Sequence, residues 1–135
     1  MGGILSQKRN KSGTRKDFVS WFEIPAIDFQ QAVNFYSYIF EIEMEQVVNE
    51  ESATAFFPVT TGIGGAITTG FNNETSTGGP LLYLNGGDDL NQVLNRVEDA
   101  GGRIIMPKTL IAKNAGYFAV FVDSQGNKLA LYSKK

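Results

Sequence analysis

The sequence predicts an α+β fold made of two β-α-β-β-β modules related by a pseudo-twofold axis. Three observations lead to this prediction. Residues 28–36 resemble residues 89–97, one strand-like segment precedes each of these stretches, and three strand-like segments follow each. A duplication on this scale is typical of paired modules whose sheets curve around a common cleft. A chain of 135 residues is long enough for one such domain with a hydrophobic core.

The repeat consists of DFQQAVNFY, which starts at Asp28, and DLNQVLNRV, which starts at Asp89. Both segments open with an Asp suited to cap a helix and have Gln three residues later. Apolar residues then recur at helical spacing. We therefore predict helices near residues 28–40 and 88–101, the second ending at the glycine pair 101–102. A chance similarity between two capped helices is the alternative.

The strand-like segments are short, apolar and bounded by turn residues. In the first half they span residues 19–26, 43–48, 54–59 and 64–70. In the second half they span residues 80–87, 103–107, 116–123 and 128–133. The polar, glycine-containing stretch 71–80 is predicted to be the linker. We therefore expect modules at 18–70 and 81–133 within one domain, preceded by a basic, mobile tail at 1–17.

The composition excludes several kinds of site. The chain has no Cys and no His, so it has no disulfide, no thiol nucleophile and no Ser-His-Asp triad. Five basic residues and no acidic one occur among the first 16, which leaves seven basic and 14 acidic residues in the remainder. An acidic body argues against nucleic acid as the main partner.

Nothing in the chain predicts a membrane-spanning segment. No apolar run is long enough to cross a bilayer, and no secretory hydrophobic region follows Met1. We therefore expect a cytoplasmic protein. The opening MGGILS fits an N-myristoylation pattern, so a lipid-anchored tail is the alternative.

These modules, opened by WFEIPAIDFQQAVNFY, resemble the vicinal oxygen chelate superfamily. That superfamily holds glyoxalase I, the bleomycin-resistance proteins and the extradiol dioxygenases. The segments GPLLYLN, EDAGGRIIMPKTLI and GYFAVFVDSQGNKLALYS are similar to the second module of its small members. The resemblance covers about residues 18–133. It implies the glyoxalase/bleomycin resistance protein/dihydroxybiphenyl dioxygenase fold, commonly as a homodimer.

Metal-using members of that superfamily hold a cation with two ligands from each module. By position, the resemblance places these ligand sites at Trp21, Leu82 and Ala130, with the fourth near Thr68 or Thr69. These side chains lack the imidazole and carboxylate donors that a divalent cation needs. We therefore expect neither a metal nor another cofactor.

Strand alternation gives a candidate binding site in the cleft. It puts Trp21 and Glu23 on one face of the first strand, with Phe22 and Ile24 packed under the helix. The 61-residue repeat assigns Leu82 and Leu84 to the equivalent face of the second module, beside Ala130 and Tyr132. Such an apolar, aromatic lining with one carboxylate suits a small, partly aromatic ligand. Alternatively, the apolar side chains fill the cleft as core, and Glu23 is solvated or paired with Lys128.

Three functions are consistent with this cleft. The first is metal-free binding of a small molecule, and the second is a fold-only module that binds a protein partner. The third is a lyase or isomerase with Glu23 as general base. The absence of a second catalytic group ranks the enzyme last.

Overall fold

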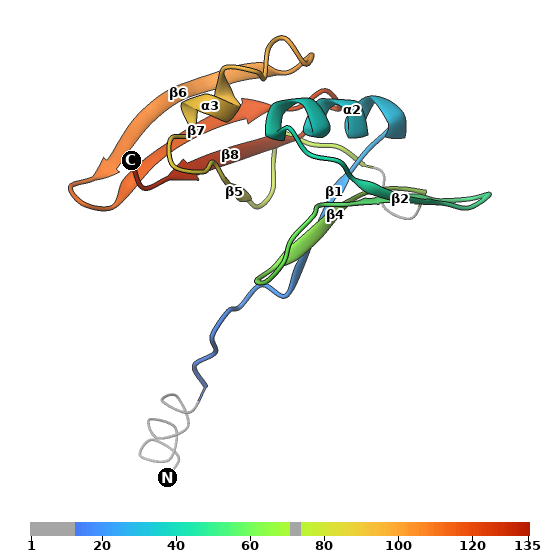
Figure 1. Ribbon diagram of the computed structural model, residues 1–135, viewed down its shortest axis with the longest axis horizontal. Coiled ribbons are helices and arrows are strands. Elements are labelled where there is room, and N and C mark those ends of the chain that lie inside the picture. Colours follow the sequence, from blue (N-terminus) through green and yellow to red (C-terminus); the bar gives the residue numbers. More distant parts are fainter. Residues whose placement is uncertain (1–12, 71–73) are drawn as a thin grey trace.

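Two four-stranded sheets and two helices make up the computed structural model, which describes residues 13–70 and 74–135 (Figure 1). Most of the predicted basic tail, including the MGGILS pattern, lies outside the described residues. So does the start of the predicted linker. No helix in the described part of the chain is long and apolar enough to cross a membrane.

The first module forms a sheet with the strand order β1-β4-β3-β2. Strand β1 is parallel to β4, and the other neighbours are antiparallel. Its elements are β1 (Trp21–Pro25), α2 (Phe29–Phe40), β2 (Glu45–Val48), β3 (Ala53–Phe56) and β4 (Gly64–Thr69).

The second module repeats this topology as β5-β8-β7-β6, again with a parallel first pair. Its elements are β5 (Tyr83–Asn85), α3 (Asn91–Leu94), β6 (Arg103–Ala112), β7 (Gly116–Val122) and β8 (Lys128–Ser133). The matching strand order confirms the predicted pair of β-α-β-β-β modules.

Helix α2 forms as its sequence pattern predicts. The Asp28 carboxylate accepts a hydrogen bond from Gln31 N at 3.1 Å, which satisfies one of the unpaired amides at the helix start. The helix ends at Glu41, which has a left-handed φ of 56° and donates its N–H to Ser37 O. Its buried face carries Ala32, Val33, Phe35, Tyr36 and Ile39.

Helix α3 is shorter than predicted. Regular α-helix covers only Asn91–Leu94, and the chain continues to residue 101 as turns. Several amides there bond three residues back, such as Arg96 N to Val93 O at 3.0 Å, as in a tight 3₁₀ turn. Asp89 does not cap this helix as Asp28 caps α2, because its Oδ1 accepts from Asn91 N and Lys108 Nζ instead.

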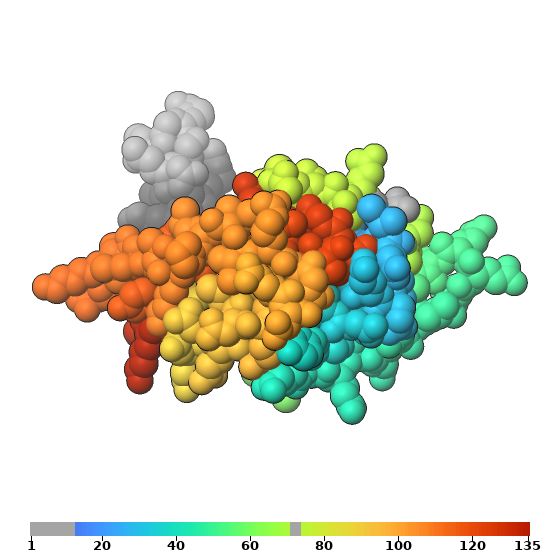
Figure 2. Space-filling model, turned by 90° about the horizontal axis from the view of Figure 1, so that it is seen from above, coloured from blue at the N-terminus to red at the C-terminus, as the bar shows by residue number. Residues whose placement is uncertain are grey.

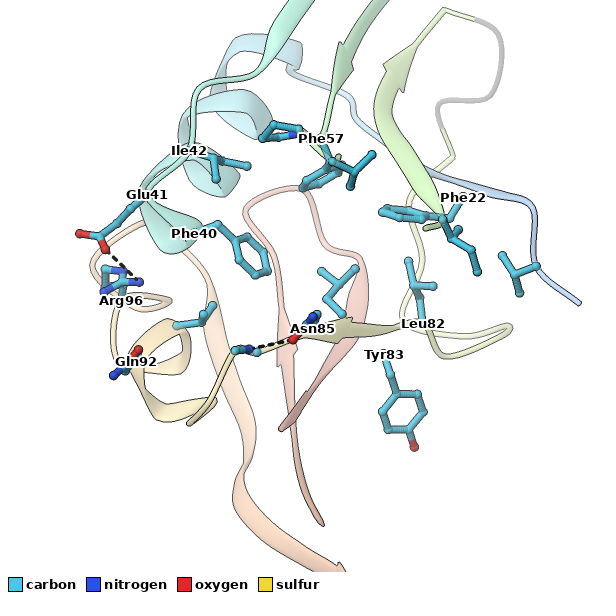
Figure 3. Close-up of a pocket in the computed structure, with 18 residues that line it drawn as sticks. Phe22, Phe40, Glu41, Ile42, Phe57, Leu82, Tyr83, Asn85, Gln92 and Arg96 are labelled. Atoms are coloured by element: carbon cyan, nitrogen blue, oxygen red, sulfur yellow. Dashed lines mark hydrogen bonds and ion pairs between the residues drawn. The ribbon is translucent and has the colours of Figure 1, made fainter. Parts of the chain in front are cut away.

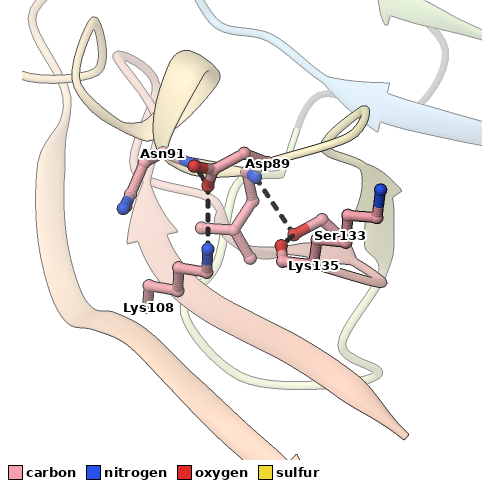
Figure 4. Close-up of polar contacts among 6 residues, drawn as sticks. Asp89, Asn91, Lys108, Ser133 and Lys135 are labelled. Carbon is pink, nitrogen blue, oxygen red and sulfur yellow. Dashed lines mark hydrogen bonds and ion pairs between the residues drawn. The ribbon is translucent and has the colours of Figure 1, made fainter. Parts of the chain in front are cut away.

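Contacts of Asp89 and Leu90 tie the start of α3 to strands β6 and β8 (Figure 4). The hydrogen bond from Asn91 N and the Lys108 ammonium, 2.9 Å from Oδ1, hold the pKa of Asp89 below its usual value. The next amide, Leu90 N, donates to Ser133 Oγ on β8 at 3.0 Å. Tertiary contacts, more than a local cap, therefore fix where this short helix begins.

Helix α2 belongs to the first module in sequence but packs on both sheets. The Phe35 ring stacks on Phe121 of β7 with centroids 6.1 Å apart, and the Tyr36 ring meets Phe57 of the first module edge-on at 5.6 Å. Figure 2 shows the first module (blue to green) beside the second (yellow to red), with the teal end of α2 against the yellow α3 segment. One hydrophobic core thus runs through both modules.

A buried carboxylate, Asp123, joins the modules beneath α2. It accepts hydrogen bonds from Tyr36 Oη at 2.7 Å, from Gln125 N at 2.8 Å and from Asn127 N at 2.9 Å. Asn127 Nδ2 also bonds Asp123 at 3.1 Å and Pro25 O at 2.8 Å. Burial, reinforced by the Asp123 charge, raises the pKa of Tyr36 well above its usual value. The turn between β7 and β8 is therefore locked to β1 and α2.

We predict that Tyr36→Phe lowers the free energy of unfolding by about 1–3 kcal/mol, because it leaves a buried carboxylate with one donor fewer. Urea denaturation measures this loss. Tyr38→Phe is the matched control, since Tyr38 is 48% exposed on the same helix. Equal effects of the two substitutions would contradict the role given to Asp123.

Candidate functional site

A groove with a volume of about 740 Å³ opens between the two modules on the side of the helices. We call it the inter-module groove (Figure 3). Its apolar lining from the first module includes Phe22, Phe40, Ile42, Phe57, Val59 and Ile63. Its apolar lining from the second module is Leu82, Leu84 and Val93. The polar side chains at its border include Glu41, Asn85, Gln92 and Arg96.

Phe57 lies at the centre of the aromatic wall. Its ring is 5.5 Å from that of Phe22 and 6.5 Å from that of Phe40, which it meets at a right angle. Phe22 lies directly over Gly65 of β4, where a Cβ would come within 2.3 Å of the ring. Glycine at position 65 therefore allows the Phe22 ring to rest on the strand and form this side of the groove.

The opposite wall comes from β5 and the residues beside it. Leu82 and Leu84 both line the groove, while the Tyr83 side chain points away from it (Figure 3). This is the alternation expected of a strand. The turn that follows is fixed by Asn85 Oδ1, which accepts from Gly87 N at 2.9 Å.

Arg96 and Glu41 close one end of the groove. Arg96 Nε donates to Ile39 O in the last turn of α2 at 2.9 Å. Nη2 of the same guanidinium lies 3.6 Å from Oε1 of the Glu41 carboxylate. The Arg96 side chain is only 27% exposed, compared with 73% for Glu41. The arginine is therefore anchored, while the glutamate is largely in solvent.

Trp21 and Glu23, both predicted site residues, lie outside this groove. They occupy the face of the first sheet that points away from α2, where Trp21 is 46% exposed. Trp21 Nε1 donates a long hydrogen bond of 3.3 Å to Glu23 Oε2. In the described part of the chain, Glu23 makes no ion pair with Lys128. Phe22 and Ile24 pack on the core side, as predicted.

Ala130 and Tyr132 also lie outside the groove, on the corresponding outer face of the second sheet. Ala130 pairs with Tyr83, and Tyr132 pairs with Asn85. Ala130 is fully buried among its neighbours, while Tyr132 is partly exposed and donates to Ala115 O at 2.9 Å.

The predicted face of Leu82 and Leu84 is wrong. Leu84 pairs with Leu131 and is buried in the core, on the face opposite Ala130 and Tyr132. In the second module, Leu84 takes the place that Ile24 takes in the first, 60 residues earlier. Ile24 pairs with Ile67 in the last strand of its module, and Leu84 pairs with Leu131 in the last strand of its own. The helix repeat is offset by 61 positions, since one extra residue separates β5 from Asp89. A shift of one residue moves a strand side chain to the other face.

The same register corrects two positions assigned by resemblance. At an offset of 60 residues, the counterpart of Trp21 is Leu81 and not Leu82. Glu23 pairs with Ala66, as Tyr83 pairs with Ala130, so the first-module counterpart of Ala130 is Ala66 and not Thr68 or Thr69. Alanine offers no metal donor either. Across residues 13–70 and 74–135, no group of three or more acidic side chains is arranged to hold a metal ion.

Sequence reasoning did not identify Phe22, Phe40, Phe57 or Arg96 as binding residues. The prediction that Phe22 packs under the helix is correct. That this face borders an open groove depends on how far apart the modules stand. No spacing of residues along the chain carries that information.

Solved structures with this fold include glyoxalases and binding proteins. The E144Q mutant of glyoxalase I from Zea mays matches with a TM-score of 0.66 at 16% identity, over 84% of this chain and 44% of that one. This chain therefore spans less than half the length of the maize enzyme. TnmS3, an antibiotic binding protein from Streptomyces sp. CB03234, matches with a TM-score of 0.65 at 19% identity, over 90% of this chain and 99% of that one.

A third match is a glyoxalase/bleomycin resistance protein from Albidiferax ferrireducens, with a TM-score of 0.62, 16% identity, and coverage of 88% of this chain and 100% of that one. A search of curated protein sequences found no match. A family model, described as the Glyoxalase/Bleomycin resistance protein/Dioxygenase superfamily, matches residues 19–131. The chain therefore belongs to the glyoxalase/bleomycin resistance protein/dioxygenase superfamily.

Proposed function

We propose that this protein binds a small, partly aromatic organic molecule in the inter-module groove. The observation that carries the proposal is the groove itself, with a volume of about 740 Å³ and apolar walls from both modules. Pockets for small molecules typically have volumes of about 300–1,000 Å³ and apolar, aromatic walls with a few polar groups. In this proposal Leu82 and Leu84 contact the ligand, as the sequence predicts, but from the groove and not from the outer face of the sheet.

Binding without a metal is favoured over catalysis. The chain has no His and no Cys, and the positions that the family resemblance assigns to metal ligands carry no suitable donor. Glu23, the predicted general base, is exposed and lies outside the groove. TnmS3, whose fold is similar, is an antibiotic binding protein, which is consistent with a binding role for this chain.

We also propose a homodimer, in which the outer face of the first sheet meets that of the partner's second sheet. Monomeric soluble proteins rarely leave large apolar patches exposed, yet these faces carry exposed Trp21, Val47, Tyr83 and Tyr132. Their charges are complementary. The register places Glu23 and Glu45 on the outer face of the first sheet, and Lys128 and Arg103 on that of the second.

We predict that 2-naphthamide, a neutral bicyclic probe, binds the protein and that Val59→Trp weakens this binding at least tenfold by filling the groove. Isothermal titration calorimetry in EDTA-containing buffer measures the affinity, which should not depend on metal. Val48→Trp is the matched control, because Val48 is also largely exposed and lies on β2, outside the groove and on the opposite face of the strand from Val47. Equal loss in both variants, or loss of binding on adding EDTA, would contradict the proposal.

We predict that Glu23→Lys weakens the homodimer at least tenfold, because it opposes like charges across the interface. The double variant Glu23→Lys/Lys128→Glu should restore dimerisation by exchanging the two signs. Sedimentation equilibrium measures both effects. A wild-type protein that remains monomeric at high micromolar concentration would refute the dimer.

A further inference from the structure

We infer that the ligand of the inter-module groove is an aromatic carboxylate whose anionic group binds Arg96. This inference rests on the proposed function, because it concerns the chemistry of the same groove. The described residues that line the groove include two with charged side chains, Arg96 and Glu41. Arg96 is hydrogen-bonded to the backbone and mostly buried, whereas Glu41 is mostly exposed, so the groove presents the Arg96 charge to a ligand.

Arg96 is held in place by its Nε–H, which donates to Ile39 O at 2.9 Å. That bond fixes the plane of the guanidinium at the end of α2. Within the described chain, the terminal Nη1 and Nη2 groups make no hydrogen bond, and Nη2 only approaches Glu41 at 3.6 Å. A guanidinium presents donors in a planar fork that fits the two oxygens of a carboxylate. Arg96 therefore has donors free for an anionic ligand.

Glu41 is a weak competitor for those donors. Its side chain is 73% exposed, and it forms no hydrogen bond with Arg96 in the described structure. Exposed ion pairs of this kind contribute little to stability. Solvent is available to hydrate the Glu41 carboxylate once a ligand carboxylate takes its place. The groove end thus presents the Arg96 guanidinium to a bound carboxylate, while the Glu41 carboxylate can turn to solvent.

The rest of the groove selects the apolar part of the ligand. Phe22, Phe40 and Phe57 form one wall, with Phe57 in ring contact with both others. Leu82 and Leu84 face the groove from the other module. A flat aromatic group can pack against these rings while its carboxylate reaches Arg96 at the groove end. A cationic group at that end would meet the guanidinium instead of a carboxylate.

Three probes on one frame test this inference: 2-naphthoate, neutral 2-naphthamide and cationic 2-naphthylmethylamine. By calorimetry at neutral pH, naphthoate is expected to bind about 10- to 100-fold more tightly than naphthamide, as for a charge-assisted hydrogen bond. The amine should bind most weakly. Arg96→Gln should reduce naphthoate affinity to that of naphthamide and leave naphthamide affinity unchanged. Lys113→Gln, which removes an exposed cation outside the groove, should change neither.

Glu41→Gln provides a second test that leaves Arg96 intact. Because it removes the competing carboxylate, it should tighten naphthoate binding about twofold to fivefold and leave naphthamide unchanged. If naphthoate and naphthamide bind equally and neither variant separates them, the carboxylate inference is overturned while groove binding stands. If no probe binds, the proposed function fails and the inference fails with it.

Discussion

The buried carboxylate of Asp123 is the contact on which the arrangement of the two modules depends. A buried charge without hydrogen-bond partners is strongly destabilising, and Asp123 meets this requirement with donors from α2 and from its own turn. Its neighbour Gln125 adds to the joint, since its Oε1 accepts from Ile27 N and Asp28 N at the start of α2. The turn between β7 and β8 thus sets where α2 lies relative to the second sheet.

This position of α2 explains why the molecule presents two kinds of surface. Because α2 packs on both sheets, the core is shared, and the modules leave the inter-module groove where the end of α2 meets β5 and the α3 segment. The outer faces of the two sheets remain exposed and carry opposite charges. We propose different tasks for the two surfaces. The groove would take a small molecule, and the outer faces would take a second copy of the chain.

The topology was predictable from the sequence because local signals agree with it. Asp28, the apolar spacing in residues 28–40 and the repeated strand-like segments all indicate the observed modules. The face of Leu84 was not predictable from the repeat, since the extra residue before Asp89 shifts the strand against the helix. The start of α3 depends on contacts with Lys108 and Ser133, which are distant in sequence. Arg96 becomes a candidate only when Ile39 and Glu41 are seen beside it.

The central claim is that ligands enter the inter-module groove and not the outer faces of the sheets. Intermolecular NOEs between 2-naphthoate and protein with ¹³C-labelled Ile, Leu and Val methyl groups test it most directly. The account predicts NOEs to Ile42, Ile63 and Leu84, which line the groove. NOEs confined to Val47 and Val120, which the strand register places on the outer faces, would contradict it.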